Sequence, residues 1–240
     1  MTTKRICLWS GPRNVSTALM YSFRERSDTS VVDEPLYAHY LAATGVEHPA
    51  VQDVIASQDA DGVNVIETVV FGPSATPVRF FKHMAHHLVD IDLSLIDGAD
   101  NVLLTRDPVE MLPSLVNQVP NPTLEGTSLP MQVRLLERME KAGRLPLVLD
   151  SGLLLANPAG VLAALCDRLG LDFDPAMLSW PAGPKPEDGV WAQHWYHRVH
   201  HSTGFEPYEP TTRPMPGHLV GLLAECRPLY DRLRQHALGG

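Results

Sequence analysis

The stretch KRICLWSGPRNVSTALMYSF, residues 4–23, decides the fold because it joins an apolar strand to a helix through a tight turn. Residues 6–9 form a short apolar run that fits a buried parallel strand, and the turn Ser10-Gly11-Pro12 ends it. We expect a helix to begin between Asn14 and Ser16. Its predicted buried side chains are Ala18, Leu19, Met20 and Phe23. A strand, a tight turn and a helix start present unpaired N–H groups and the positive end of a helix dipole to one point, which attracts anions.

Comparison with the Walker loop, G-x-x-x-x-G-K-[ST], limits which anion this turn can hold. Counted from Gly11, the equivalent positions are Ser16, Thr17 and Ala18, so the second Gly, the Lys and the metal-binding hydroxyl are absent. The one cation is Arg13. The neutral polar side chains are Ser10, Asn14, Ser16 and Thr17. The loop is therefore predicted to hold a phosphate without Mg-ATP, and an ordinary capped turn is the alternative.

Length and composition indicate one globular domain spanning residues 1–240. The hydrophobic fraction of 44% supports a packed core. Net charge is −9 with the acids spread along the chain, so we expect no nucleic-acid partner. An anionic ligand must then be met by a local cluster of basic residues.

Cysteine spacing and hydropathy indicate where in the cell the protein is expected to be. Cys7, Cys166 and Cys226 form no C-x-x-C pair, which argues against a disulfide framework or a cysteine-based zinc site. The first residues run into the first strand without a signal-peptide segment, and no apolar run is long enough for a membrane span. We expect a cytoplasmic protein with no membrane partner. Its oligomeric state is open, with a homodimer as one possibility.

Apolar runs rich in β-forming residues alternate with helical stretches. They lie at residues 4–9, 29–34, 78–83, 101–106 and 145–151. This alternation predicts an α/β fold with a parallel sheet flanked by helices on both faces, in which ligands bind at the carboxyl ends of the strands. Polar groups follow four of the runs: Arg13, Asp33-Glu34, Lys82-His83 and Arg106-Asp107. Solvated loop charges would explain any single one of them, but not readily the whole set.

Beyond residue 120 we predict two helices and a covering segment. The first lies in residues 131–143 and buries Leu135, Leu136 and Met139. The second is capped by Asn157, has Pro158 in its first turn and ends at Gly170. Residues 180–216, rich in Pro, Gly, His and aromatic residues, are predicted to form a cover loop or lid.

A second anion-binding element is predicted in NVLLTRDPVEMLPSL, residues 101–115. Arg106 ends a strand, Pro108 begins a helix, and Ser114 lies eight positions after Arg106, about two helical turns in. A guanidinium and a hydroxyl placed in this way can together bind a phosphate.

These two elements, in this order, resemble the sulfotransferases that use 3′-phosphoadenosine 5′-phosphosulfate (PAPS). The resemblance covers roughly residues 4 to 172 and is strongest to divergent bacterial-type members. It implies a P-loop-like fold, PAPS as donor, 3′,5′-ADP as product and no metal requirement. By motif, the implied 5′-phosphosulfate residues are Gly11, Pro12, Arg13, Asn14, Val15, Ser16 and Thr17, and the implied 3′-phosphate residues are Arg106 and Ser114.

The chain also departs from the family pattern. The loop GPRNVST replaces a Gly-Thr-Thr type sequence, and VRFFKHMAHHL matches the Lys-containing strand with its catalytic His only loosely. The Gly-rich nucleotide loop is not recognisable, although residues 196–205 could replace it. Some bacterial-type members carry aminotransferase-like names, but a pyridoxal-phosphate enzyme needs a Schiff-base Lys in a larger scaffold, for which we find no context.

A hydroxyl acceptor needs a base, and Glu34 is the first candidate because it stands where some divergent members place a catalytic carboxylate. A structural Glu capping the next helix is the alternative. His83 and His86 are the other candidate bases. Lys82 would stabilise the sulfuryl group or the leaving group.

Clusters of His and aromatic residues have simpler explanations beside functional ones. The runs HMAHH (83–87) and HWYHRVHH (194–201) place imidazoles at helical spacing, which could bind zinc, but the H-E-x-x-H pattern is absent and surface or pocket histidines are favoured. Four aromatic residues could line an acceptor pocket or pack in the core: Trp180, Trp191, Trp195 and Tyr196.

The sequence thus predicts a PAPS-dependent sulfotransferase acting on a hydroxyl or amine of a small molecule or sugar. A P-loop kinase would need Mg-ATP, and the missing Gly-Lys-Ser/Thr argues against it. A non-catalytic nucleotide-binding protein on the same fold is the third reading.

Overall fold

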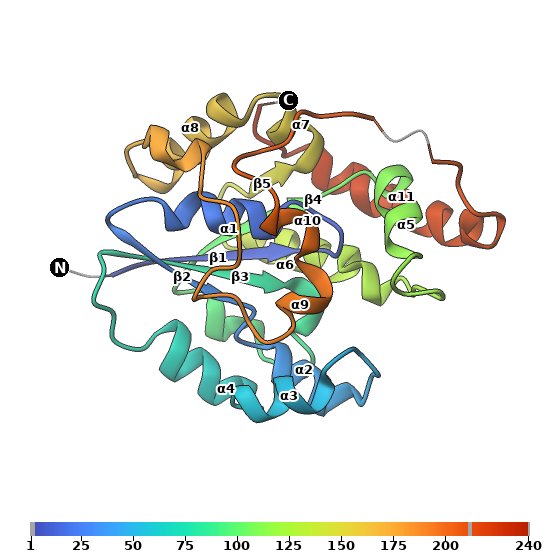
Figure 1. Cartoon of the computed structure of the whole chain (residues 1–240), viewed down its shortest axis with the longest axis horizontal. Helices are drawn as coiled ribbons and strands as arrows, with labels where there is room; N and C mark the ends of the chain where they lie inside the picture. The colour runs from blue at the N-terminus through green and yellow to red at the C-terminus, as the bar shows by residue number, and fades with distance from the viewer. Residues whose placement is uncertain (1–2, 211–212, 240) are drawn as a thin grey trace. The chain divides into compact units, whose positions relative to one another are not determined.

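The computed structural model of the chain describes residues 3–210 and 213–239. Within these residues, five parallel strands form one sheet in the order β2-β3-β1-β4-β5 (Figure 1). The strands are β1 (Lys4–Ser10), β2 (Thr29–Asp33), β3 (Val78–Met84), β4 (Asp100–Thr105) and β5 (Leu147–Asp150). Each predicted apolar run forms one strand, so the predicted α/β class with a parallel sheet is confirmed.

The opening stretch folds as its pattern predicts. Strand β1 is buried from Ile6 onward, and helix α1 (Ser16–Arg24) begins at the end of the predicted interval. Leu19, Met20 and Phe23 are buried in α1 as expected, whereas Ala18 is only half-buried. Tyr21, which was not among the predicted buried residues, is fully buried.

The chain divides into two compact units. Unit 1 is Met1–Leu8, Ser16–Asn101 and Asp174–Phe205, and unit 2 is Trp9–Val15, Val102–Phe173 and Glu206–Gly240. Strands β1 and β4 contribute residues to both. The expectation of a single domain stays a prediction. The predicted lid over residues 180–216 also stays a prediction. Its residues 180–205 belong to unit 1 and 206–210 to unit 2, and residues 211 and 212 lie outside the described part.

Unit 1 is built around the parallel pair β2 and β3, in which Asp33 lies opposite Lys82. Helices α2, α3 and α4 are grouped together beyond these strands (Figure 1). Its α-helices are α1, α2 (Tyr37–Thr44), α3 (Val51–Ser57), α4 (Gly62–Val65), α9 (Ala192–Trp195) and α10 (His197–His200). Its other helical turns are a π-helix η1 (Ile66–Val70) and 3-10 turns η2 (Ala85–His87), η3 (Leu93–Ile96) and η5 (Pro175–Leu178).

Unit 2 is built around the parallel pair β4 and β5, in which Thr105 lies opposite Asp150. Helix α11 packs beside α5 and α6. Its α-helices are α5 (Pro108–Leu115), α6 (Leu129–Lys141), α7 (Ser151–Ala156), α8 (Pro158–Leu169) and α11 (Val220–Arg234). Two 3-10 turns are η4 (Glu125–Thr127) and η6 (Gly217–Leu219).

The two predicted helices of this unit are confirmed. Helix α6 buries Leu135, Leu136 and Met139. In α8 the Asn157 side chain accepts from the N–H of Gly160, and Gly170 ends the helix in the left-handed conformation. Beyond α11 the chain returns to β5, where Ala237 forms a parallel bridge with Val148 and the Leu238 N–H donates to the Val148 carbonyl.

Candidate active site

The turn after β1 is held in an unusual backbone conformation. Arg13 has φ of 57°, in the left-handed region that costs a non-glycine residue of order 1–3 kcal/mol. At Gly11 an added Cβ would lie 2.6 Å from the Thr127 carbonyl oxygen, so only glycine fits there without a backbone shift. A strained loop packed tightly against backbone is expected where a ligand site is preformed.

The predicted anion-binding residues Arg13, Arg106 and Ser114 meet in unit 2 and are called here the Arg13 group. Arg13 Nε donates to Ser114 Oγ at 3.0 Å, and Arg106 Nη1 donates to the Arg13 carbonyl at 2.8 Å. Arg13 Nη1 also donates to Gln118 Oε1 at 3.1 Å. Residues 93 and 101 positions apart in the chain thus bring two guanidiniums and a hydroxyl together, in a protein whose net charge is −9.

Arg106 keeps part of its hydrogen-bonding capacity. A guanidinium has five N–H donors. Three are used among the described residues, one by the Arg13 carbonyl and two by Oε2 of Glu110, at 3.3 and 3.2 Å. The other Glu110 oxygen accepts from the Tyr208 hydroxyl at 2.5 Å, which raises the pKa of Tyr208 to about 12. Two donors on Arg106 and the Ser114 hydroxyl proton are therefore left for a ligand by this part of the chain.

Other residues of the predicted loop take structural positions. The Asn14 amide donates to Ser10 Oγ at 3.3 Å and to the Leu104 carbonyl at 2.8 Å, so its donors tie the loop to β4. Pro12 and Val15 are half-buried. Ser16 and Thr17 begin α1 in unit 1. The structure thus brings Arg13, Arg106 and Ser114 together, whereas the Asn14 side chain makes hydrogen bonds within the protein.

Unit 1 holds a buried charged group at the ends of β2 and β3, called here the Lys82 group: Asp33, Glu34, Lys82 and Tyr196. Lys82 Nζ donates to Asp33 Oδ1 at 3.1 Å, to Glu34 Oε1, and to the Tyr196 hydroxyl at 2.5 Å. The Tyr196 hydroxyl donates to the Asp33 carboxylate, whose oxygens lie 2.9 and 2.7 Å away. The predicted pair Glu34 and Lys82 is therefore in contact.

One cation facing two carboxylates sets the protonation of this group. Burial raises the pKa of Glu34, and the Lys82 ammonium only partly opposes this because Asp33 adds a second negative charge. Burial alone would lower the pKa of Lys82, but the two carboxylates more than offset it and the pKa is raised. Burial and the same carboxylates raise the pKa of Tyr196 well above 10.0. Lys82 thus stays an ammonium and Tyr196 a phenol, leaving Glu34 as the residue whose charge is least favoured.

Glu34 is held by its backbone and does not cap a helix. Its φ is 40°, its N–H donates to the Lys82 carbonyl at 2.7 Å, and its carbonyl accepts from Gln58 Nε2 at 3.0 Å. Helix α2 starts at Tyr37 with Leu36 as its N-cap and no side-chain cap, so the structural alternative for Glu34 is wrong. The Glu34 carboxylate is contacted by Lys82 and by the Tyr196 hydroxyl, and both Asp33 oxygens accept hydrogen bonds.

The two histidines named as other candidate bases lie in different surroundings. His83 is buried within β3, and burial together with the Lys82 charge lowers its pKa to about 3. His86 is half-buried beside Tyr40 and His87, and burial followed by the charge of His48 lowers its pKa to about 3. Both imidazoles are neutral near pH 7. The expected helical spacing of this run is wrong because His83 belongs to a strand and the next residues form a 3-10 turn.

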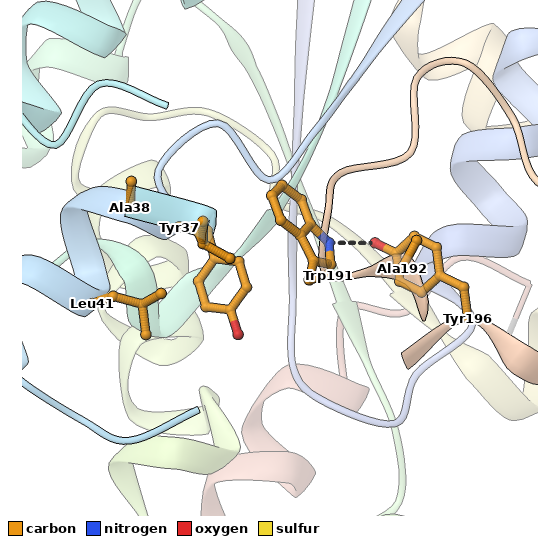
Figure 2. Close-up of a cluster of buried hydrophobic side chains, with 7 residues drawn as sticks. Tyr37, Ala38, Leu41, Trp191, Ala192 and Tyr196 are labelled. Atoms are coloured by element: carbon orange, nitrogen blue, oxygen red, sulfur yellow. Dashed lines mark hydrogen bonds between the residues drawn. The ribbon is translucent and has the colours of Figure 1, made fainter. Parts of the chain in front are cut away.

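The aromatic residues of segment 191–196 pack in a buried cluster with α2. It contains Tyr37, Ala38, Leu41, Val54, Trp191, Ala192 and Tyr196. Trp191 Nε1 donates to the Tyr196 hydroxyl at 3.2 Å, as the dashed line in Figure 2 shows. Gly189 makes room for this indole, because an added Cβ would lie 2.2 Å from its ring. Trp191 and Tyr196 are therefore core residues, and the Tyr196 hydroxyl reaches the Lys82 group.

A second buried carboxylate fastens this segment within unit 1. Asp188 accepts from the Tyr21 hydroxyl at 2.8 Å and from the Lys185 N–H at 2.8 Å, and His200 Nε2 lies 3.0 Å away. Its neighbour Glu187 pairs with Arg24 at 2.8 Å. The segment 185–200 is thus bound to α1 by side chains.

Sequence reasoning missed three members of these groups. The sequence places Asp33 at a strand end without giving it a role, predicts a pocket or core position for Tyr196, and gives no role to Glu110. Of the three, only Asp33 has a signal in the sequence. It stands next to Glu34 at the same strand end, so a lysine that pairs with Glu34 is expected to contact Asp33 as well. Among residues 3–210 and 213–239, no three His, Cys, Asp or Glu residues are placed to hold a metal ion. No helix in that part of the chain has the length and apolar character to cross a membrane.

Comparisons with known proteins match this chain to a domain family and to a fold. A family model described as "Sulfotransferase domain" matches residues 4–237. The solved structure of the sulfotransferase domain from the curacin biosynthetic pathway has a TM-score of 0.60 at 15% identity, covering 97% of this chain and 98% of that one. A sulfotransferase domain from the olefin synthase of Synechococcus PCC 7002 has a TM-score of 0.56 at 16% identity, covering 94% and 95%. These structures have the same fold, which confirms the predicted architecture.

Two curated relatives come from Arabidopsis thaliana and are named branched-chain-amino-acid aminotransferase-like proteins 1 and 2. They are 40% and 38% identical to this chain over 229 residues. The match covers 95% of this chain and 41% of each relative. The chain thus spans less than half the length of these relatives.

Proposed function

The chain belongs to the sulfotransferase-domain family, and from this premise we propose that it transfers a sulfuryl group from PAPS to a hydroxyl or amine of a small-molecule or sugar acceptor. The observation that carries the proposal is the Arg13 group, in which both predicted anion-binding elements meet through hydrogen bonds of 3.0 and 2.8 Å. A cytoplasmic location and a homodimer belong to the same proposal.

The donor set of the Arg13 group fits the phosphates of this donor. Arg13 and Arg106 supply two positive charges. The two Arg106 N–H groups that no described residue occupies, together with the Ser114 hydroxyl, supply three hydrogen-bond donors. Guanidiniums suit phosphate oxygens because they bind in a planar, paired geometry. Glu110 opposes a full phosphate dianion at Arg106, and a bound phosphate has to outcompete that carboxylate.

The donor supplies an activated sulfuryl group, whose S–O bond to the bridging oxygen breaks as sulfur forms a new bond to the acceptor oxygen or nitrogen and 3′,5′-ADP leaves. The acceptor proton needs a base, and Glu34 provides one through its buried carboxylate beside Lys82. Its raised pKa brings its basicity closer to neutral pH, where a general base is most effective. We assign Lys82 the role of holding Oε1 and compensating the charge of the two carboxylates.

The alternatives differ in what they bind. A P-loop kinase needs a Lys and a hydroxyl for Mg-ATP, and the loop from Gly11 to Thr17 supplies neither at the Walker positions. A non-catalytic protein would retain the Arg13 group and have no use for the strained Glu34 backbone, which costs of order 1–3 kcal/mol. The aminotransferase-like names of the two relatives describe proteins more than twice as long, and we assign this chain no such activity.

Calorimetric titration of the purified chain with 3′,5′-ADP and, separately, with Mg-ATP tests the proposal. We expect 3′,5′-ADP to bind and Arg106→Ala to weaken it by roughly 10- to 100-fold, the loss of one charge-assisted phosphate contact. Arg168→Ala, which removes an exposed arginine from α8, is the matched control and should bind as the parent does. Preference for Mg-ATP would favour the kinase, and binding of neither nucleotide would end the donor assignment.

A further inference from the structure

The Tyr196 hydroxyl is fully engaged in hydrogen bonds with groups from three parts of unit 1. It accepts from Lys82 Nζ at 2.5 Å and from Trp191 Nε1 at 3.2 Å, and it donates to the Asp33 carboxylate at 2.7 Å. A phenol has one proton and two lone pairs, so each is used. Its ring is 5% exposed and packs in the aromatic cluster of Figure 2.

The Lys82 ammonium is likewise saturated. It has three N–H donors, and they go to Asp33, Glu34 and Tyr196. The side chain is 2% exposed, so no water replaces a lost partner at the surface. A lysine ammonium on its flexible stem has no preferred direction of its own, which means that its three acceptors decide where it points.

We propose that Tyr196 is a positioning residue for the reaction, which holds the Lys82 ammonium against Oε1 of Glu34 and thereby orients the carboxylate that receives the acceptor proton. Two of the three acceptors, Asp33 and Glu34, come from neighbouring positions at the end of β2. Tyr196 lies 114 residues from Lys82 and is the only neutral acceptor of the three. The inference rests on the proposed roles of Glu34 and Lys82.

Gly189 and Trp191 support this assignment. The Gly189 N–H donates to Asp33 Oδ2 at 3.3 Å, so the same segment approaches the carboxylate through backbone as well as through Tyr196. The indole that donates to Tyr196 lies where any side chain at position 189 would stand. Residues 189–196 therefore place the Tyr196 hydroxyl against the Lys82 group through hydrogen bonds, in addition to packing its ring in the core.

The charged groups and hydroxyls that face Glu34 determine whether its pKa rises or falls when Tyr196 is changed. They are Asp33 on β2, Lys82 on β3, and the hydroxyls of Tyr37 on α2 and Tyr196. Burial raises the pKa of Glu34 most, and a hydrogen bond from the Tyr196 hydroxyl to the Glu34 carboxylate lowers it. Removing that hydroxyl should therefore raise the pKa of Glu34 further, and the pH at which Glu34 becomes a base should move upward.

Tyr196→Phe removes the hydroxyl and keeps the ring, and Tyr37→Phe is its matched control. Tyr37 is equally buried in the same cluster, and its hydroxyl is bonded to His48 Nδ1 at 2.8 Å instead of to the Lys82 group. The measurement is a carbon NMR titration of the full chain labelled at its glutamate carboxyls, with the Glu34 signal assigned by its loss in Glu34→Gln. It requires neither donor nor acceptor, so it separates this inference from failure of the proposed donor binding.

We expect the Glu34 midpoint to rise by roughly 0.5 to 1 pH unit in Tyr196→Phe and by about 0.2 or less in Tyr37→Phe. Equal midpoints in the two variants would overturn the proposal. If Tyr196→Phe does not fold, Tyr196→3-fluorotyrosine keeps every partner and places a fluorine reporter beside the hydroxyl. Its fluorine signal should then titrate with the Glu34 midpoint and lose that step in Glu34→Gln, and a signal without that step would refute the positioning role.

Discussion

Arg13 Nε donates to Ser114 Oγ across 3.0 Å, joining the first turn of the chain to the second turn of α5. Ser114→Ala removes this acceptor together with the hydroxyl proton left for a ligand. We expect binding of 3′,5′-ADP to weaken roughly tenfold, about 1.4 kcal/mol, as measured by calorimetric titration. Ser114→Thr keeps the hydroxyl and should restore most of the affinity. If Ala and Thr variants bind alike, the hydroxyl has no part in the site.

Gly11→Ala should disturb the loop through backbone contact. The added Cβ would stand 2.6 Å from the Thr127 carbonyl oxygen, so the loop or η4 must move, at a cost of about 1–3 kcal/mol. Denaturant unfolding and 3′,5′-ADP titration should both register the change. Gly221→Ala is the control, because nothing lies near that position on α11 and a helical alanine is favoured by about 0.5–1 kcal/mol. Equal stability of the two variants would show that the loop yields freely.

His83 should make the protein less stable in acid. Its pKa is lowered from 6.5 to about 3 in the folded chain, so the folded state binds fewer protons than the unfolded state between these values. Unfolding free energy should therefore be lost as pH falls from 6.5 towards the folded pKa, by at most about 1.4 kcal/mol per pH unit. Urea unfolding of His83→Gln across this range should show a shallower decline than the parent. Parallel declines would mean that His83 does not carry the effect.

Asp188→Asn should loosen segment 185–200. The carboxylate is 4% exposed and accepts bonds from Tyr21 and Lys185, so its loss should cost about 1–3 kcal/mol. Limited proteolysis should then cleave within this segment sooner than in the parent chain. Glu187→Gln breaks a partly exposed pair with Arg24, and about 1 kcal/mol or less is expected. Faster cleavage in Glu187→Gln than in Asp188→Asn would reverse this ranking.

The fold could be read from the sequence because its signals are local. Each of the five apolar runs forms a strand, and the capping residues Asn157 and Gly170 correctly predict the two ends of α8. The meeting of Arg13, Arg106 and Ser114 also followed, since parallel strands deliver their carboxyl ends to one edge of a sheet.

The partners of these charges could not be read, because each depends on a long-range approach. Tyr196 reaches Lys82 across 114 residues, and no local pattern in HWYHRVHH distinguishes a tyrosine that bonds a lysine from one that packs in the core. Glu110 pairs with Arg106 at helical spacing, which was readable in principle. An arginine at the end of a strand is equally compatible with an anionic ligand and with a carboxylate one helical turn later, so the sequence alone does not decide between them.

The bridge between Val148 and Ala237 has a consequence for aggregation. Strand β5 is at one end of the strand order, and an open edge there could pair with a strand from another molecule. The segment after α11 covers part of that edge, because the backbone N–H of Leu238 donates a hydrogen bond to the Val148 carbonyl. Protection of this kind tolerates almost any side chain at position 238 and excludes proline, which lacks the N–H that closes the edge.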